Sequence, residues 1–289
     1  MKKHLNNIIV SMAMVAMLFN SCTPTDPRSE LQNAHKLMQQ NQFDNALPRI
    51  RTCLDMDSEN VDAIIANALC VYNLQPRDND ACKNARLKLS RVTSTLAPTR
   101  FDAWYTYTWV LMEDMDYDKA VNAARRARTL FRSLHNLPSH ENDVCDKTDL
   151  TLAKENLAYA NLILMTADIC RHNGLTEGMP FFKVALSIPS FAELPELYLA
   201  YAQWLLEAGR KRDAHIVASE ATSKFSDNLP CAYNYALIDE YCSREMKLPD
   251  PLRDKLIRKF DRAFTFARKS GNLAIEKRIA AKMAQLQRR

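Results

Sequence analysis

The chain has 289 residues, of which 47% are hydrophobic and 25% are charged, and its net charge is +5. This hydrophobic content can build a core, so the composition excludes disorder for most of the chain. The whole chain has only four glycines, which are too few for the phosphate-binding loops and tight hairpins of many α/β enzymes. The weak positive charge gives no reason to expect nucleic acid as a partner.

The first 21 residues have the features of an export signal. Lys2 and Lys3 follow the first residue, an apolar stretch covers residues 8–19, and Ser21 directly precedes Cys22. The apolar stretch is shorter than the roughly 20 residues that a helix needs to cross a bilayer. We therefore interpret residues 1–21 as a signal peptide and residues 22–28 as a tether. The alternative is an ordinary secretory signal with an incidental cysteine.

The residues that end this leader resemble the lipobox of Bacteroidetes-type lipoproteins. Phe19 and Asn20 stand where the common pattern has Leu and a small residue, but the box ends in Ser-Cys, as looser lipoboxes do. The resemblance implies cleavage before Cys22, a diacylglycerol thioether on its sulfur and acylation of the new amino terminus. Several acyl chains, each contributing about 0.8 kcal/mol per buried CH₂, would anchor the protein stably. Thr23 does not resemble an inner-membrane retention signal, so we expect the outer membrane of the cell envelope.

From Ser29 onward the sequence repeats with a period of about 34 residues and carries small residues at matched positions. The clearest copy spans Phe101 to Ser133 and contains Trp104, Thr108, Leu111, Tyr117, Ala120 and Ala127. A second copy spans Pro195 to Asn228 and contains Tyr198, Ala202, Leu205, Gly209, Ala214 and Ala221. These residues stand at positions typical of the tetratricopeptide repeat, which the chain resembles.

Three further copies are weaker. One begins near Pro27 and has Cys53 where the repeat has alanine, and one runs from Val61 to Pro98 with an inserted turn. The last pairs a helix over 152–172 with a helix over 179–188. The resemblance thus covers residues 27–228. The alternative is a generic helical bundle with alanine-rich contacts.

The resemblance implies an all-α fold, a right-handed superhelix of helix-turn-helix repeats over residues 29–228. After it, helices near 231–246, 252–270 and 273–286 are expected to form a C-terminal cap over 229–289. Basic residues dominate this end: Lys277, Arg278, Lys282, Arg288 and Arg289. We interpret them as a solvated helix face, and a site for anionic lipid headgroups or glycans is the alternative.

In tetratricopeptide proteins the first helix of each unit lines an inner groove. Carried over by position, the candidate groove residues are Leu69, Tyr72, Tyr105, Trp109, Met112, Tyr159, Gln203 and Leu206. This aromatic and aliphatic surface suits an apolar helix or an extended peptide. It lacks most of the Lys, Asn and Arg with which family members bind acidic peptide tails. The alternative is that Tyr105, Trp109 and Tyr159 pack against neighbouring helices.

One polar segment, Ser133 to Thr148, has side chains that could bind zinc. They are His135, His140, Glu141, Asp143, Cys145 and Asp146. The ligand types are mixed and no Cys-x-x-Cys or His-Glu-x-x-His spacing occurs, so we expect a solvated loop, no metal and no cofactor. No nucleophile-elbow sequence occurs either, so no catalytic residue is assigned. We expect Cys53 and Cys170 to be packing residues.

Together these features predict a membrane-anchored scaffold that binds a protein or peptide partner in the cell envelope. It is expected to be neither an enzyme nor a nucleic-acid-binding protein. One alternative is a lipoprotein that captures glycans or nutrients beside an outer-membrane transporter. The other is a metal-dependent enzyme that uses the loop from His135 to Asp146.

Overall fold

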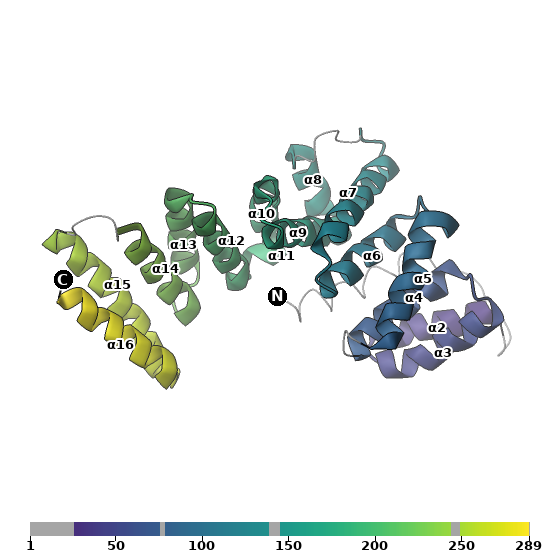
Figure 1. The fold of residues 1–289 in the computed structure, drawn as a ribbon, viewed down its shortest axis with the longest axis horizontal. Coiled ribbons are helices and arrows are strands. Elements are labelled where there is room, and N and C mark those ends of the chain that lie inside the picture. The colour runs from purple at the N-terminus through teal and green to yellow at the C-terminus, as the bar shows by residue number, and fades with distance from the viewer. Residues whose placement is uncertain (1–25, 76–78, 139–144, 244–248, 289) are drawn as a thin grey trace. The chain divides into compact units, whose positions relative to one another are not determined.

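The computed structural model describes residues 26–75, 79–138, 145–243 and 249–288 (Figure 1). Within these ranges all regular structure is helical and no strand occurs. The chain divides into two compact units, residues 1–188 and residues 189–289. Each unit is built from helix pairs that follow one another along the chain, which confirms the predicted all-α solenoid of tetratricopeptide type. The signal peptide and Cys22 lie outside the described residues.

The described part of unit 1 consists of four helix pairs and one additional helix. The pairs are α2 with α3, α4 with α5, α6 with α7, and α9 with α10, and short connections make each pair antiparallel. The helices are α2 (Pro27–Gln39), α3 (Phe43–Met56), α4 (Val61–Leu74), α5 (Asp80–Arg91), α6 (Phe101–Glu113), α7 (Tyr117–Leu134), α8 (Lys147–Glu155), α9 (Leu157–His172) and α10 (Met179–Leu186). A π-helical turn, Val92–Leu96, extends α5, and a 3₁₀ turn, Thr176–Gly178, precedes α10.

Unit 2 continues the same construction to the end of the chain. Its helices are α11 (Pro189–Ala192), α12 (Pro195–Glu207), α13 (Lys211–Lys224), α14 (Leu229–Ser243), α15 (Asp250–Lys269) and α16 (Leu273–Gln287). From α12 onward each helix packs against the next. The division between units falls inside the predicted repeat region, and the assignment of the last three helices to a cap stays a prediction.

Small buried side chains explain why these helices approach closely. Ala120 and Ala127 in α7 are fully buried, as are Ala214 and Ala221 in α13. Cys53 takes the same role in α3 and is also fully buried, as expected for a packing residue. Since an alanine or cysteine at the contact leaves room for a whole helix to approach, the periodic small residues determine where the helix pairs form.

Six helices end in the same backbone motif. The second residue after each helix has a positive φ, and these residues are Asn41, Met115, Asn136, Gly174, Gly209 and Gly271. The following N–H reaches back to a carbonyl of the last turn, as from Asp116 N to Leu111 O at 2.9 Å. Gly and Asn adopt the left-handed conformation readily, so Met115 is the exception.

The predicted helix over 152–172 is wrong in one respect, because the structure has two helices there. Asn156 separates α8 from α9, and its side-chain oxygen accepts hydrogen bonds from the backbone N–H groups of Ala158 and Tyr159. Its backbone is extended, so the α-helical path is interrupted at this residue. As a result α8 is an additional helix. None of the described helices is both long enough and apolar enough to cross a bilayer.

Candidate functional site

Four of the eight predicted groove residues lie in the interior of unit 1. Leu69, Tyr105, Trp109 and Tyr159 are all buried. The ring of Trp109 meets Tyr72 edge-on at 5.9 Å between centroids, and Tyr159 stacks on Phe131 at 4.5 Å. This arrangement favours the packing alternative for the four residues. Their contact with a partner stays a prediction.

The other four are at least partly exposed. Tyr72 and Met112 are half-buried in unit 1, whereas Leu206 is half-buried and Gln203 exposed in unit 2. The Gln203 side-chain amide donates to Glu207 Oε1 at 2.9 Å. Tyr72 also supports, from beneath, a surface groove that the sequence did not predict.

This groove lies in unit 1 between α5 and the turn that joins α6 to α7. It encloses about 650 Å³. One wall of the groove consists of α5 residues three or four positions apart, which lie on the same face of the helix. The other wall consists of residues from α6, from the turn after it and from the start of α7. The lining residues are Lys83, Arg86, Leu87, Ser90, Tyr107, Glu113, Asp114, Met115 and Lys119. We call this set the α5–α6 groove.

Asp114 holds three helices together beneath the groove. Its Oδ2 accepts a hydrogen bond from the Tyr72 hydroxyl of α4 at 2.8 Å and one from Arg86 Nη1 of α5 at 2.9 Å. The second Arg86 nitrogen lies 3.7 Å from Asp116 Oδ2. Burial, and then the Asp114 carboxylate, raise the pKa of Tyr72, so the phenol stays a donor. These charge-assisted contacts fix the wall and the floor of the groove relative to each other.

Two apolar side chains project from the groove into solvent. Leu87 is 72% exposed and Met115 is 65% exposed. Leu87 lies away from the buried side of α5, which is formed by Cys82, Ala85 and Leu89. Met115 has φ +60°, which costs a residue with a side chain roughly 1–2 kcal/mol. Strain of this kind persists only where the surrounding structure holds it, as the helix-end hydrogen bonds do here, and such residues cluster at functional sites.

The groove also has charged groups of both signs. Lys83 and Lys119 are exposed, and Lys119 Nζ lies 2.8 Å from Asp116 Oδ2. Lys83 Nζ lies 3.3 Å from Asp80 Oδ1. The lining contains neither histidine nor cysteine. Such a surface can bind an extended segment with apolar side chains between polar ones.

Sequence reasoning missed this groove because it searched only the first helix of each repeat. The groove lies between α5, the second helix of one repeat, and the turn between the two helices of the next repeat. Two signals were present in the sequence. Leu87 falls outside the apolar period of its helix, and Met115 occupies the position where the later copy has Gly209.

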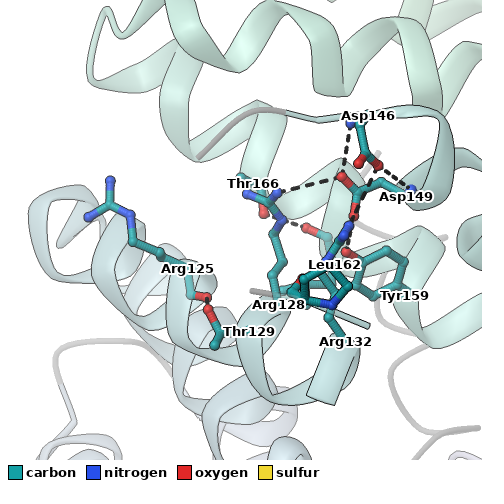
Figure 2. A network of polar contacts seen from close by, with 10 residues as sticks. Arg125, Arg128, Thr129, Arg132, Asp146, Asp149, Tyr159, Leu162 and Thr166 are labelled. Atoms are coloured by element: carbon teal, nitrogen blue, oxygen red, sulfur yellow. Dashed lines mark hydrogen bonds and ion pairs between the residues drawn. The ribbon is translucent and has the colours of Figure 1, made fainter. Parts of the chain in front are cut away.

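A buried polar network, seen in Figure 2, attaches α8 to the rest of unit 1. Asp149 of α8 accepts hydrogen bonds from Arg132 Nη1 at 2.8 Å and from the Tyr159 hydroxyl. Arg128 Nη2 lies 3.8 Å from its other oxygen. Asp146 and Asp149 also form a reciprocal cap at the start of α8. The network therefore has a structural role.

This network includes part of the segment that we considered for zinc. His140, Glu141 and Asp143 lie outside the described residues. Among the residues that the structure describes, no three His, Cys, Asp or Glu side chains are grouped so as to hold a metal ion. Burial and the nearby carboxylates raise the pKa of the Cys145 thiol, which opposes formation of the thiolate that metals bind.

The successive helix pairs define the fold, an all-α helical repeat of the tetratricopeptide type. PilF of Pseudomonas aeruginosa has a similar solved structure, with a TM-score of 0.57 and 13% identity over 89% of this chain and 97% of that chain. PilW, a type IV pilus biogenesis factor, has a TM-score of 0.48 and 14% identity over 89% of this chain and 91% of that chain. A tetratricopeptide protein of Thermus thermophilus has a TM-score of 0.44 and 15% identity over 74% of this chain and 98% of that chain.

Neither a family model nor a curated protein sequence matches the chain. At 13% identity the likeness to PilF concerns the fold alone.

Proposed function

We propose that this protein is a lipid-anchored scaffold of the cell envelope whose α5–α6 groove binds an extended segment of a partner polypeptide. The observation that carries the proposal is Met115. Its side chain stays exposed in the groove although its backbone has a conformation that Gly or Asn would adopt at lower cost. A binding role explains why an apolar side chain is retained there.

The second apolar side chain, Leu87, complements Met115 from the α5 side. Both are fixed to a rigid base, because Asp114 ties α4, α5 and α6 together. Preorganised apolar anchors give binding energy at a small cost in entropy. Lys83 and Lys119 already pair with Asp80 and Asp116, so the two apolar side chains, and not these lysines, would supply the binding energy.

The anchor is proposed on Cys22, at the end of the signal peptide. Cys22→Ser removes the thiol that would be acylated. We expect the variant to leave the membrane fraction and appear in the soluble envelope fraction. If it stays with membranes as strongly as the original protein, the proposed anchor is wrong.

Photo-crosslinking in native envelopes tests the groove. Two variants each carry a crosslinking amino acid, one at Leu87 and one at Met115. Both should capture the same discrete partner. The matched control is Leu134, which is 66% exposed on α7 and does not line the groove. The double variant Leu87→Ser and Met115→Asn should abolish capture by a probe at Tyr107, whereas Leu134→Ser should not. Equal capture from Leu134, or capture by the double variant, would exclude the groove.

A further inference from the structure

The end of unit 2 has a charge opposite to that of the rest of the chain. Residues 250–289 contain twelve Lys or Arg and four Asp or Glu, which is a net charge of +8. The whole chain has a net charge of +5, so the residues before 250 together are at −3. The cationic character of this protein is therefore concentrated in its last two helices.

Four of these cations lie along one face of α15. Lys255, Arg258, Arg262 and Lys269 are separated by 3, 4 and 7 residues, a spacing that follows successive turns of a helix. We call them the α15 stripe, and at a rise of about 1.5 Å per residue it is about 21 Å long. The opposite face of α15 is buried and consists of Leu256, Phe260, Ala263 and Ala267.

Cations elsewhere on the two helices are paired with acids. Lys259 forms an ion pair with Asp239, and Lys282 Nζ lies 2.7 Å from Glu240 Oε1. Near the start of α15, Arg253 pairs with Asp250. These pairs join neighbouring helices or close the first turn, so their charges are already compensated.

The α15 stripe is not compensated in this way. In the described part of the chain no carboxylate forms an ion pair with Lys255, Arg258 or Lys269. Arg262 Nη2 donates to the carbonyl of Ser226 at 2.8 Å, which leaves its positive charge in place. All four residues of the stripe are exposed. Asp254 and Asp261 lie only at the margin, one residue before Lys255 and Arg262.

The composition of the stripe indicates which kind of anionic partner it fits. The other residues on this face are Pro251 and Thr265, and the half-buried Phe266 lies at its edge, with its ring centroid 5.7 Å from Arg262 Cζ. The stripe thus lacks the cluster of exposed aliphatic or aromatic anchors that protein interfaces need. One half-buried ring beside a guanidinium is not the row of aromatic side chains on which nucleic-acid bases stack. A bilayer with anionic headgroups requires only several cations that face the same way.

We propose that the α15 stripe binds the headgroups of an anionic phospholipid bilayer. The inference does not depend on the proposed peptide groove. Attraction to such a surface falls off within a Debye length, which is about 10 Å at 0.1 M salt and about 3 Å at 1 M salt. The stripe should therefore act only when α15 lies close to the membrane.

Vesicle co-sedimentation tests this proposal. The probe is a vesicle of phosphatidylcholine with one part phosphatidylglycerol in three, compared with phosphatidylcholine alone. The protein is the expected mature chain, residues 22–289, with Cys22→Ser, so that neither the apolar leader nor an acyl chain contributes. The stripe variant carries Lys255→Gln, Arg258→Gln and Lys269→Gln. The control carries Lys36→Gln, Arg126→Gln and Lys154→Gln, three exposed cations of unit 1 with the same change in net charge.

Each charge removed from the stripe should lower partitioning onto anionic vesicles about five-fold, and the triple change about 100-fold. The control should bind as the parent does, and 1 M salt should release the parent. Arg258→Gln alone should weaken binding about five-fold without any effect on folding. Equal binding by the stripe variant and the control, or equal binding to neutral vesicles, would overturn the proposal. So would stripe-dependent binding to an acidic protein with none to anionic vesicles.

Discussion

Met115 is a residue whose local cost can be measured apart from any partner. Replacing it by Gly removes the left-handed strain but also makes the unfolded chain more flexible, so we expect Met115→Gly to raise the free energy of unfolding by about 0.5–1 kcal/mol. Urea denaturation followed by circular dichroism measures this. The same variant should lose the crosslinked partner, because the apolar side chain is gone.

Gly209 provides the opposite control for Met115. It occupies the equivalent helix end with φ +75°, and no atom lies within 4 Å of the place where a Cβ would be added. Gly209→Ala should therefore lower the free energy of unfolding by about 1 kcal/mol through backbone strain alone. If Met115→Gly instead lowers the free energy of unfolding, the packing of the methionine side chain contributes more stability than its backbone strain costs.

We expect His35 to make the stability of unit 1 depend on pH. Burial lowers the pKa of His35 below its ordinary value of 6.5, and the nearby Asp62 opposes part of this effect. As the pH falls through 6.5, the unfolded chain takes up a proton before the folded chain does, so acid favours unfolding. The contribution of His35 is present above its unfolded pKa and is lost as the pH falls toward its folded pKa.

We therefore expect the melting temperature to fall between pH 7.5 and pH 5, and to fall less in His35→Gln. Thermal melts across this range would check the difference. Identical pH slopes for the parent and His35→Gln would show that this histidine does not link protonation to folding.

Asp149 is a buried carboxylate that joins α8 to α7 through Arg132 and to α9 through Tyr159. Asp149→Ala would leave the buried Arg128 without its carboxylate and the buried Arg132 with only Asp146, at 3.5 Å, so we expect a loss of about 3–5 kcal/mol. Asp146→Ala removes mainly a helix cap and should cost about 1 kcal/mol. Hydrogen exchange should show that residues 147–155 lose protection first in Asp149→Ala. Equal destabilisation by the two variants would mean that capping, not the ion pairs, holds α8.

The elements that could be predicted from sequence are those whose small residues repeat. Ala120 and Ala127 determine how α7 packs, and their spacing appears in the sequence itself. The break at Asn156 was not predictable in this way, since asparagine is also tolerated inside helices and only its backbone shows the cap. The α5–α6 groove was missed because it forms where two successive repeats of unit 1 pack together. Positions within a single helix do not describe that contact.

At the scale of the whole molecule, each unit has its own hydrophobic core. In unit 2 the core is a cluster from α14, α15 and α16: Ala232, Ala236, Leu256, Phe260, Ala263, Ala267, Ile279 and Leu286. In unit 1, Phe131 packs between Phe101 at 4.9 Å and Tyr159 at 4.5 Å. Repeat proteins gain most of their stability from contacts between neighbours, so a defect in one core should stay local.

Phe260→Ala and Phe131→Ala form a reciprocal pair that tests this independence. Phe260 is fully buried and Phe131 nearly so, and each truncation should cost about 3–5 kcal/mol. Hydrogen exchange should show α14–α16 losing protection in Phe260→Ala while α2–α7 keep theirs, and the reverse in Phe131→Ala. If either variant instead lost protection evenly along the whole chain, the two units would fold as one cooperative body. In that case any contact that stabilises unit 2, such as the ion pairs of α15 and α16 with α14, would also raise the free energy of unfolding of unit 1.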